Sequence, residues 1–83
     1  MAMPDNANKA FRLAYDKLNE NFPPENSDEF RYRIAQEFYD LTMQNGGDVL
    51  VRSLLLAVQH YLDDYAKRKA MAEYDAMMKE KKV

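Results

Sequence analysis

The chain has 83 residues and no cysteine, so it forms one domain at most and has neither a disulfide bridge nor a thiolate metal cage to stabilise it. Its 12 basic and 14 acidic residues give a net charge of -2, which disfavours general binding to a nucleic-acid backbone. Hydrophobic residues make up 47% of the chain, too many for a disordered protein. A domain of this size without disulfide bridges or a structural metal depends on good packing or on a partner chain, so we expect self-association.

Hydropathy disfavours a membrane protein. The longest unbroken apolar run covers residues 54–58, far shorter than the ~18 residues that a membrane span needs. No basic stretch leads into an apolar secretory segment near the start. We therefore expect a cytoplasmic protein with no membrane partner, and the lack of cysteine fits a reducing compartment.

The first helix is predicted over residues 6–21, after a leader of residues 1–5. Asp5 and Asn6 supply a start signal, and the Pro23–Pro24 pair disfavours helical geometry in the residue before each proline. Apolar residues recur at intervals of three or four, which is the period of an amphipathic helix. They are Ala7, Phe11, Ala14, Tyr15, Leu18 and Phe22.

The second helix is predicted over residues 27–44. Asn26 is the expected cap, because Glu29 follows three residues later as in a capping box, and the Asn45–Gly46 pair is the expected left-handed stop. One apolar stripe of this helix consists of Phe30, Ile34, Phe38 and Leu41. A second stripe, roughly 100 to 200 degrees away around the helix, consists of Tyr32, Tyr39 and Met43.

Two interpretations of the second stripe are open. In one, the second helix is the central element, sandwiched between the other two, with its tyrosine hydroxyls reaching solvent. In the other, the stripe contacts a partner protein, because tyrosine and methionine are enriched at protein interfaces. Tyr32, Tyr39 and Met43 are therefore candidate protein-interaction residues.

The third helix is predicted over residues 48–80, with Asp48 as its cap and neither proline nor glycine from there to Val83. A helix of this length measures ~50 Å, about twice what the two shorter helices can cover. Its first half has one broad apolar face, made of Leu50, Val51, Leu54, Leu55, Val58, Tyr61, Leu62, Tyr65 and Ala66. After the basic residues 67–69 the apolar positions move by roughly 100 degrees or more, to Ala70, Met71, Tyr74, Met77 and Met78.

Three outcomes are possible for the end of the third helix. It can kink near residues 67–70 and fold back, it can project and dock on another chain, or it can be a frayed, partly ordered tail that ends in residues 79–83. No helix breaker occurs near residues 67–70, which favours projection. Met71, Tyr74, Met77 and Met78 are accordingly candidate protein-interaction residues.

Residues that could carry chemistry are few. His60 has Asp63 and Asp64 three and four positions later, so a surface His–Asp hydrogen bond is possible. The serines have no nucleophile-elbow signature, and no zinc, calcium, di-iron or phosphate-loop motif occurs in the sequence. We expect no enzyme activity, no cofactor and no metal.

Nucleic-acid recognition is a minor hypothesis. The second and third helices resemble a helix-turn-helix in outline, but residues 49–56 are too apolar for a helix that reads bases. The basic residues 67–69 form the one basic patch of note, and Glu73 and Asp75 dilute it.

The sequence thus predicts an all-α fold, a small three-helix bundle with a long, partly projecting C-terminal helix in a single domain of residues 1–83. The expected function is that of a small protein-interaction module, an accessory, adaptor or inhibitor protein of bacterial or phage type. The alternative is a structural homo-oligomer, a dimer or higher, assembled through the end of the third helix. The expected core consists of Phe11, Leu18, Ile34, Phe38, Leu41, Leu54, Leu55, Val58 and Leu62.

Overall fold

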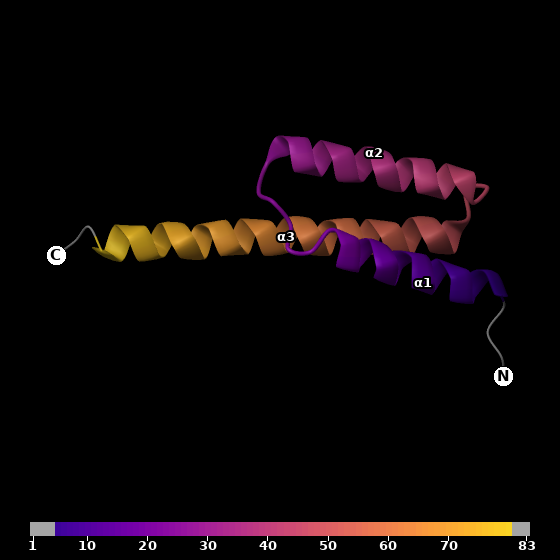
Figure 1. The fold of residues 1–83 in the computed structure, drawn as a ribbon, viewed down its shortest axis with the longest axis horizontal. Helices are drawn as coiled ribbons and strands as arrows, with labels where there is room; N and C mark the ends of the chain where they lie inside the picture. Colours follow the sequence, from indigo (N-terminus) through magenta and orange to yellow (C-terminus); the bar gives the residue numbers. More distant parts are fainter. Residues whose placement is uncertain (1–4, 81–83) are drawn as a thin grey trace.

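The computed structural model describes residues 5–80, and these form three helices: α1 (Asp5–Glu20), α2 (Asp28–Gln44) and α3 (Val49–Glu80) (Figure 1). No strand occurs in this part of the chain, so the predicted all-α fold is confirmed. Each helix begins and ends within one residue of its predicted position. Residues 1–4 of the predicted leader and residues 81–83 of the predicted tail lie outside the described residues.

The start of α2 is capped by Ser27. The Ser27 hydroxyl oxygen accepts a hydrogen bond of 3.1 Å from the backbone N–H of Phe30. The prediction that Asn26 caps this helix is wrong, because α2 begins one residue later than that cap requires. The Asn26 side chain instead accepts a hydrogen bond of 2.9 Å from Arg31, which also donates to Asp28 at 2.7 Å.

The turn between α2 and α3 has the predicted form. Asn45 ends α2, and Gly46 and Gly47 follow with φ of 69 and 71 degrees, a left-handed conformation that glycine adopts without steric cost. Asp48 then caps α3, because its carboxylate accepts hydrogen bonds of 2.9 and 3.1 Å from the backbone N–H groups of residues 50 and 51. The turn therefore reverses the chain tightly and lays α3 back along α2.

The central helix is α3, which lies between α1 and α2 (Figure 1). Both shorter helices pack on its first half, whereas the Cα atoms of α1 and α2 do not approach within 8 Å of each other. The Cα trace measures 59 × 30 × 17 Å, so the three-helix bundle is elongated along α3 (Figure 1). The interpretation that the second helix is central is therefore wrong, because the broad apolar face of α3 has room for a helix on each flank.

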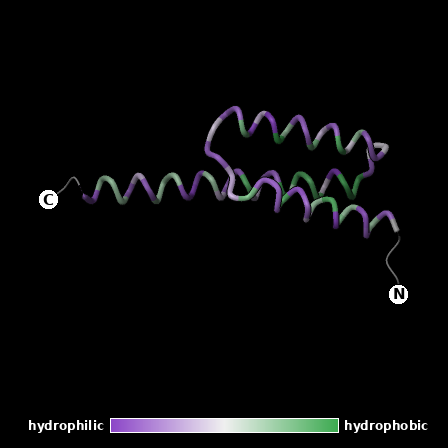
Figure 2. The backbone as a smooth tube through the Cα atoms, in the orientation of Figure 1, coloured by the Kyte–Doolittle hydropathy of each residue, from purple (hydrophilic) through white to green (hydrophobic). Residues whose placement is uncertain are grey.

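The core lies where α1 and α2 meet the first half of α3, and Figure 2 shows hydrophobic residues concentrated in that half. Ile34, Leu55 and Leu62 are almost completely buried, and Phe38 is buried beside them. The prediction that these four residues form the core is confirmed. Leu18, Leu41, Leu54 and Val58, also predicted, are partly buried at its margin.

The prediction that Phe11 belongs to the core is wrong. Its side chain is 47% exposed, because α1 packs on α3 with its alanine face and Phe11 lies beside that face. The residues of α1 that are buried are Ala7, Ala10 and Ala14, spaced along one side of the helix. Small side chains let two helices approach closely, so the fully buried face of α1 contributes close packing, and Leu13 adds a partly buried side chain beside it. The other buried residues missing from the predicted core are Phe30, Val51 and Ala66.

A polar contact links the edges of α1 and α2. The ammonium nitrogen of Lys17 lies 2.9 Å from a carboxylate oxygen of Glu20 and 3.1 Å from one of Glu37. The hydrogen bonds to Glu20 and Glu37 raise the pKa of Lys17 above its ordinary value, so its ammonium group stays charged at neutral pH. This ion pair joins α1 and α2 directly, beside the contacts that each makes with α3.

Candidate protein-interaction surface

Helix α3 continues well beyond the bundle. Ala66 is its last buried residue, and the helix runs without interruption to Glu80. The prediction that it projects is confirmed, and the alternative that it kinks near residues 67–70 and folds back is wrong. We call residues 67–80 the distal segment; at 1.5 Å per residue it is about 21 Å long.

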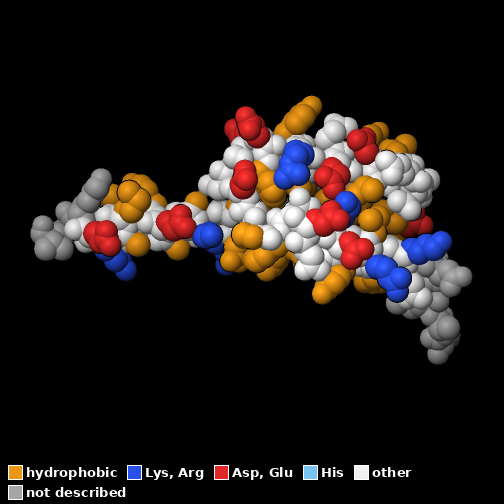
Figure 3. Space-filling model, in the orientation of Figure 1, with side chains coloured by type: hydrophobic (Ala, Val, Ile, Leu, Met, Phe, Trp, Pro, Cys, Tyr) orange, Lys and Arg blue, Asp and Glu red, His pale blue; other side chains and the backbone are white. Residues whose placement is uncertain are grey.

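The distal segment carries four exposed large apolar side chains, which we call the distal patch. Met71, Tyr74, Met77 and Met78 are 67%, 62%, 56% and 42% exposed. Figure 3 shows hydrophobic side chains along the projecting part of the molecule, interspersed with charged ones. None of the described helices covers this patch, because α1 and α2 end beside the first half of α3.

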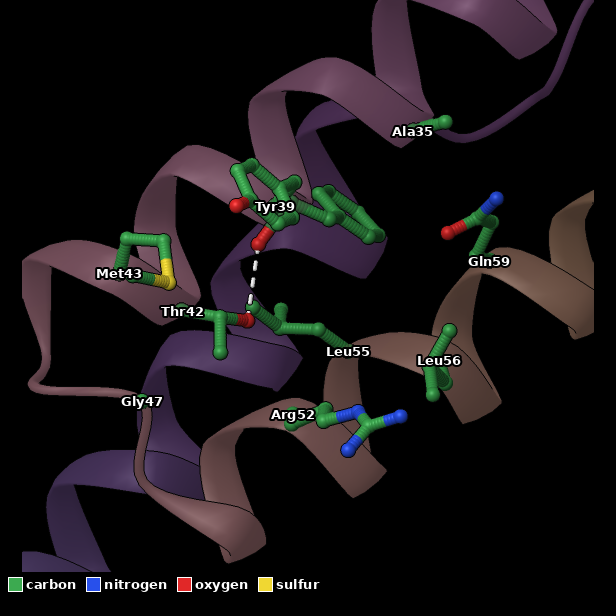
Figure 4. A pocket seen from close by; sticks show the side chains of 10 residues that line it. Ala35, Tyr39, Thr42, Met43, Gly47, Arg52, Leu55, Leu56 and Gln59 are labelled. Carbon is green, nitrogen blue, oxygen red and sulfur yellow. Dashed lines mark hydrogen bonds between the residues drawn. The ribbon is translucent and has the colours of Figure 1, made fainter.

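A groove lies between α2 and α3 (Figure 4). Its volume is about 570 Å³. Tyr39 and Met43 approach it from α2, and Arg52 and Leu56 approach it from α3. The groove, which we call the α2/α3 groove, is completed by Ala35, Phe38, Thr42, Gly47, Leu55 and Gln59.

The structure brings together two of the three predicted interaction residues of α2. Tyr39 and Met43, 62% and 56% exposed, both line the α2/α3 groove. Tyr32 is 74% exposed and lies apart from them, beside Gln36 and Asp40 on the outer side of α2. A partner bound in the groove would therefore contact Tyr39 and Met43 but not Tyr32.

Sequence reasoning missed the contribution of α3 to this groove. Leu56 is 41% exposed although it follows two leucines that are wholly or partly buried. The sequence spacing could have identified Leu56, because eighteen residues, or five turns of about 3.6 residues each, separate it from Tyr74. The two side chains therefore project from the same line along α3.

An aromatic cluster forms on the opposite flank of α3, next to α1. The rings of Phe22 and Tyr65 are 4.8 Å apart between centroids, and Tyr61 lies 6.3 Å from Tyr65. Tyr61 and Tyr65 were expected on the core face, yet they are 52% and 37% exposed. Phe22 covers them only in part, so the cluster completes the edge of the bundle rather than its centre.

Charged residues alternate in sign where the bundle ends. Asp63 lies 2.9 Å from Lys67, and Asp64 lies 2.8 Å from Arg68, both as pairs four residues apart. Asp63 also lies 3.8 Å from Arg31 of α2. Two acidic residues are thus followed, one turn later, by two basic residues.

His60 is exposed and lies outside these ion pairs. The possible hydrogen bond from His60 to Asp63 or Asp64 is not formed in the described structure, where both carboxylates bind the basic residues one turn later. We expect His60→Ala to change the free energy of unfolding by less than about 0.5 kcal/mol, as for other surface positions. Thermal unfolding at matched pH measures this, and a loss of more than about 1 kcal/mol would show that the imidazole has a structural partner.

Other kinds of site have little support among residues 5–80. No group of three or more histidine, aspartate or glutamate side chains is placed to hold a metal ion there. No described helix combines the length and the apolar character that crossing a membrane requires.

The distal patch and the α2/α3 groove are thus two exposed apolar surfaces, and each contains more than one of the predicted interaction residues. Comparison of the chain with protein-family models, curated proteins and solved structures gives no match.

Proposed function

We propose that the protein is a small interaction module that binds another protein through apolar helical surfaces. The observation that carries this proposal is the exposure of the distal patch on a helix that continues past its own bundle. Soluble monomers rarely expose contiguous apolar patches unless these are used for binding. Methionine, which supplies three of the four side chains, adapts its shape to different contact surfaces.

The α2/α3 groove supports the same proposal from the receiving side. A groove lined by apolar side chains of two helices accepts an amphipathic helix, whose side chains at intervals of three and four residues fill it. Tyr39 supplies a rigid aromatic wall with a polar tip, and Met43 supplies a flexible one. The distal patch can therefore insert into a groove of a partner, and the α2/α3 groove can accept a helix of a partner.

A second candidate is a structural homo-oligomer. The specific observation in its favour is that one chain carries both an inserting patch and a receiving groove, on the same line of α3. Identical chains can then satisfy one another without a different partner.

The function is tested with two matched variants of the distal segment. Met71→Glu with Tyr74→Glu places two charges on the distal patch, and Ala72→Glu with Ala76→Glu places two on the other side of the same segment. Circular dichroism should show that both variants keep their helices, because all four positions are exposed. We expect the patch variant to lose at least about tenfold in affinity, whether for a host protein captured by the unmodified chain or for a second copy, and the control to keep it.

Equal binding by both variants would show that the distal patch is not the binding surface. If the unmodified chain neither captures a partner nor associates with itself, the proposal that it is an interaction module fails.

A further inference from the structure

We propose that two copies of this chain form a reciprocal antiparallel dimer, in which the distal patch of each copy fills the α2/α3 groove of the other. The inference rests on the proposed function of the distal patch as a binding surface, and it names the occupant of the groove. It is carried by three features of α3: the alignment of groove and patch, the order of the charges between them, and the size of the combined surface.

The alignment follows from helix geometry. Leu56, in the wall of the groove, and Tyr74, in the distal patch, are separated by five full turns and about 27 Å along the same line of α3. A two-fold axis that crosses this line at the level of residue 65 places Tyr74 of each copy against Leu56 of the other. One symmetry operation therefore fills both grooves and covers both patches, as a closed dimer requires.

The neighbours of these two residues fit the same arrangement. Met77 and Met78 of one copy then lie at the level of Arg52 and residue 53 of the other, at the end of the groove where Met43 stands. Arg52 belongs to none of the ion pairs formed within residues 5–80. Glu80 of the first copy lies two residues, about 3 Å, beyond the level of Arg52, so an acidic side chain comes close to a basic one that has no ion-pair partner in the described part of its own chain.

The charges at the centre favour the antiparallel direction. With the two-fold axis at residue 65, Asp63 of one copy lies at the level of Lys67 of the other, and Asp64 lies near Arg68. Each acidic pair therefore faces a basic pair. A parallel pairing in register would instead place like charges side by side, which is unfavourable. Lys67 and Arg68 are 60% and 80% exposed, so the second copy can reach them although each is paired with an aspartate of its own chain.

A reciprocal contact enlarges the interface, because each copy then contributes two surfaces instead of one. Specific interfaces bury roughly 800 Å² on each partner and involve about 20–30 residues a side. The distal segment alone, residues 67–80, has fewer residues than that. In the reciprocal dimer each copy contributes its distal segment together with the ten residues that line its groove.

Sedimentation and cysteine pairing test this geometry, and the chain has no cysteine of its own to interfere. The unmodified chain should sediment at twice its mass of 9.8 kDa and dissociate on dilution. Leu56→Cys combined with Tyr74→Cys should give a covalent dimer on oxidation, because the paired positions lie face to face. Each single variant should stay without a covalent bond, because identical positions are about 27 Å apart in the dimer and a disulfide needs Cα atoms within about 7 Å.

The outcomes separate the competing arrangements. Ready cross-linking of Tyr74→Cys alone would show that two distal segments pair with each other and would overturn the proposal. A chain that stays monomeric at every concentration would overturn it too, while capture of a host protein through the distal patch would leave the proposed function standing. A dimer whose double-cysteine form does not cross-link requires the charge test, since the cysteines themselves shorten two interface side chains.

Charge exchange supplies that second measurement. One variant carries Asp63→Lys and Asp64→Lys, the other Lys67→Glu and Arg68→Glu, so each variant chain has four like charges at these positions and its homodimer has eight at the centre. We expect each to associate at least about tenfold more weakly than the unmodified chain, and a 1:1 mixture to regain the dimer as a heterodimer visible by native mass spectrometry. Circular dichroism of each variant verifies that it is folded. Unchanged association of both variants, or no recovery on mixing, would overturn the antiparallel register.

Discussion

Replacing Leu55 with alanine is expected to lower the free energy of unfolding by about 2–5 kcal/mol, the usual loss when a buried leucine is truncated in a packed core. Leu55 is 2% exposed and belongs to the central cluster with Ile34 and Phe38. For a domain of this size each kcal/mol corresponds to about 4–8 °C in the unfolding temperature. Differential scanning calorimetry or denaturant titration measures the change.

The neighbouring leucines provide matched controls for this measurement. Leu56 is 41% exposed, so Leu56→Ala should cost less than about 1 kcal/mol at protein concentrations low enough to keep the chain monomeric. Leu54 is partly buried and should fall between the two. The same change in three consecutive positions thus keeps the helix propensity constant and varies only burial. Equal losses at Leu55 and Leu56 would contradict the assignment of the core.

Replacing Ala10 with leucine is expected to destabilise the protein by about 1–3 kcal/mol, although leucine is the more hydrophobic residue. Ala10 is 2% exposed and lies against the core cluster where α1 packs on α3. Three more carbon atoms at this contact must push α1 outward or force strained rotamers, because the interior has no free volume to accept them. Denaturant titration gives the free energy, and hydrogen exchange along α1 shows whether this helix is the part that loosens.

Ala57→Leu is the control for Ala10→Leu. Ala57 lies on an exposed part of α3, so the same substitution there should change the free energy of unfolding by less than about 0.5 kcal/mol. If Ala10→Leu proves as stable as the unmodified protein, α1 does not pack on α3 through its alanines.

The helices and their ends were predictable from the sequence because local signals determine them. Asp48 caps α3 and Gly46 ends α2 through contacts with residues no more than a few positions away. The uninterrupted α3 was predictable in the same way, from the absence of breakers and the shift of its apolar positions after residue 66. Each of these features needs no knowledge of the other helices.

The arrangement of the helices was not predictable from the same signals. Phe11 is larger and more hydrophobic than Ala10, yet Ala10 is buried and Phe11 is 47% exposed, because the contact between α1 and α3 selects for small size. Hydrophobicity alone therefore assigned the wrong face of α1. Hydrophobicity also led to the wrong placement of α2 at the centre. A second apolar stripe indicates a contact with another surface, but it does not indicate whether that surface belongs to the same chain.

The candidate site was predictable in its parts and not as a whole. The four residues of the distal patch, and Tyr39 and Met43 on α2, were all identified from their spacing and residue type. The α2/α3 groove depends on how α2 packs on α3, because its lining residues come from these two helices and the turn between them. That arrangement depends on packing between distant residues, which periodicity does not describe.

Because α3 is continuous, hydrogen exchange along this one helix reports on both the folding of the bundle and binding at the distal patch. Backbone amides in its first half are protected by packing against α1 and α2, so they exchange with solvent only when the bundle opens. Amides of the distal segment have only the helix itself for protection and should exchange faster toward Glu80. A ligand on the distal patch would slow the second group and leave the first almost unchanged. One helix thus records folding at one end and occupancy at the other, in a single exchange experiment on the unmodified chain.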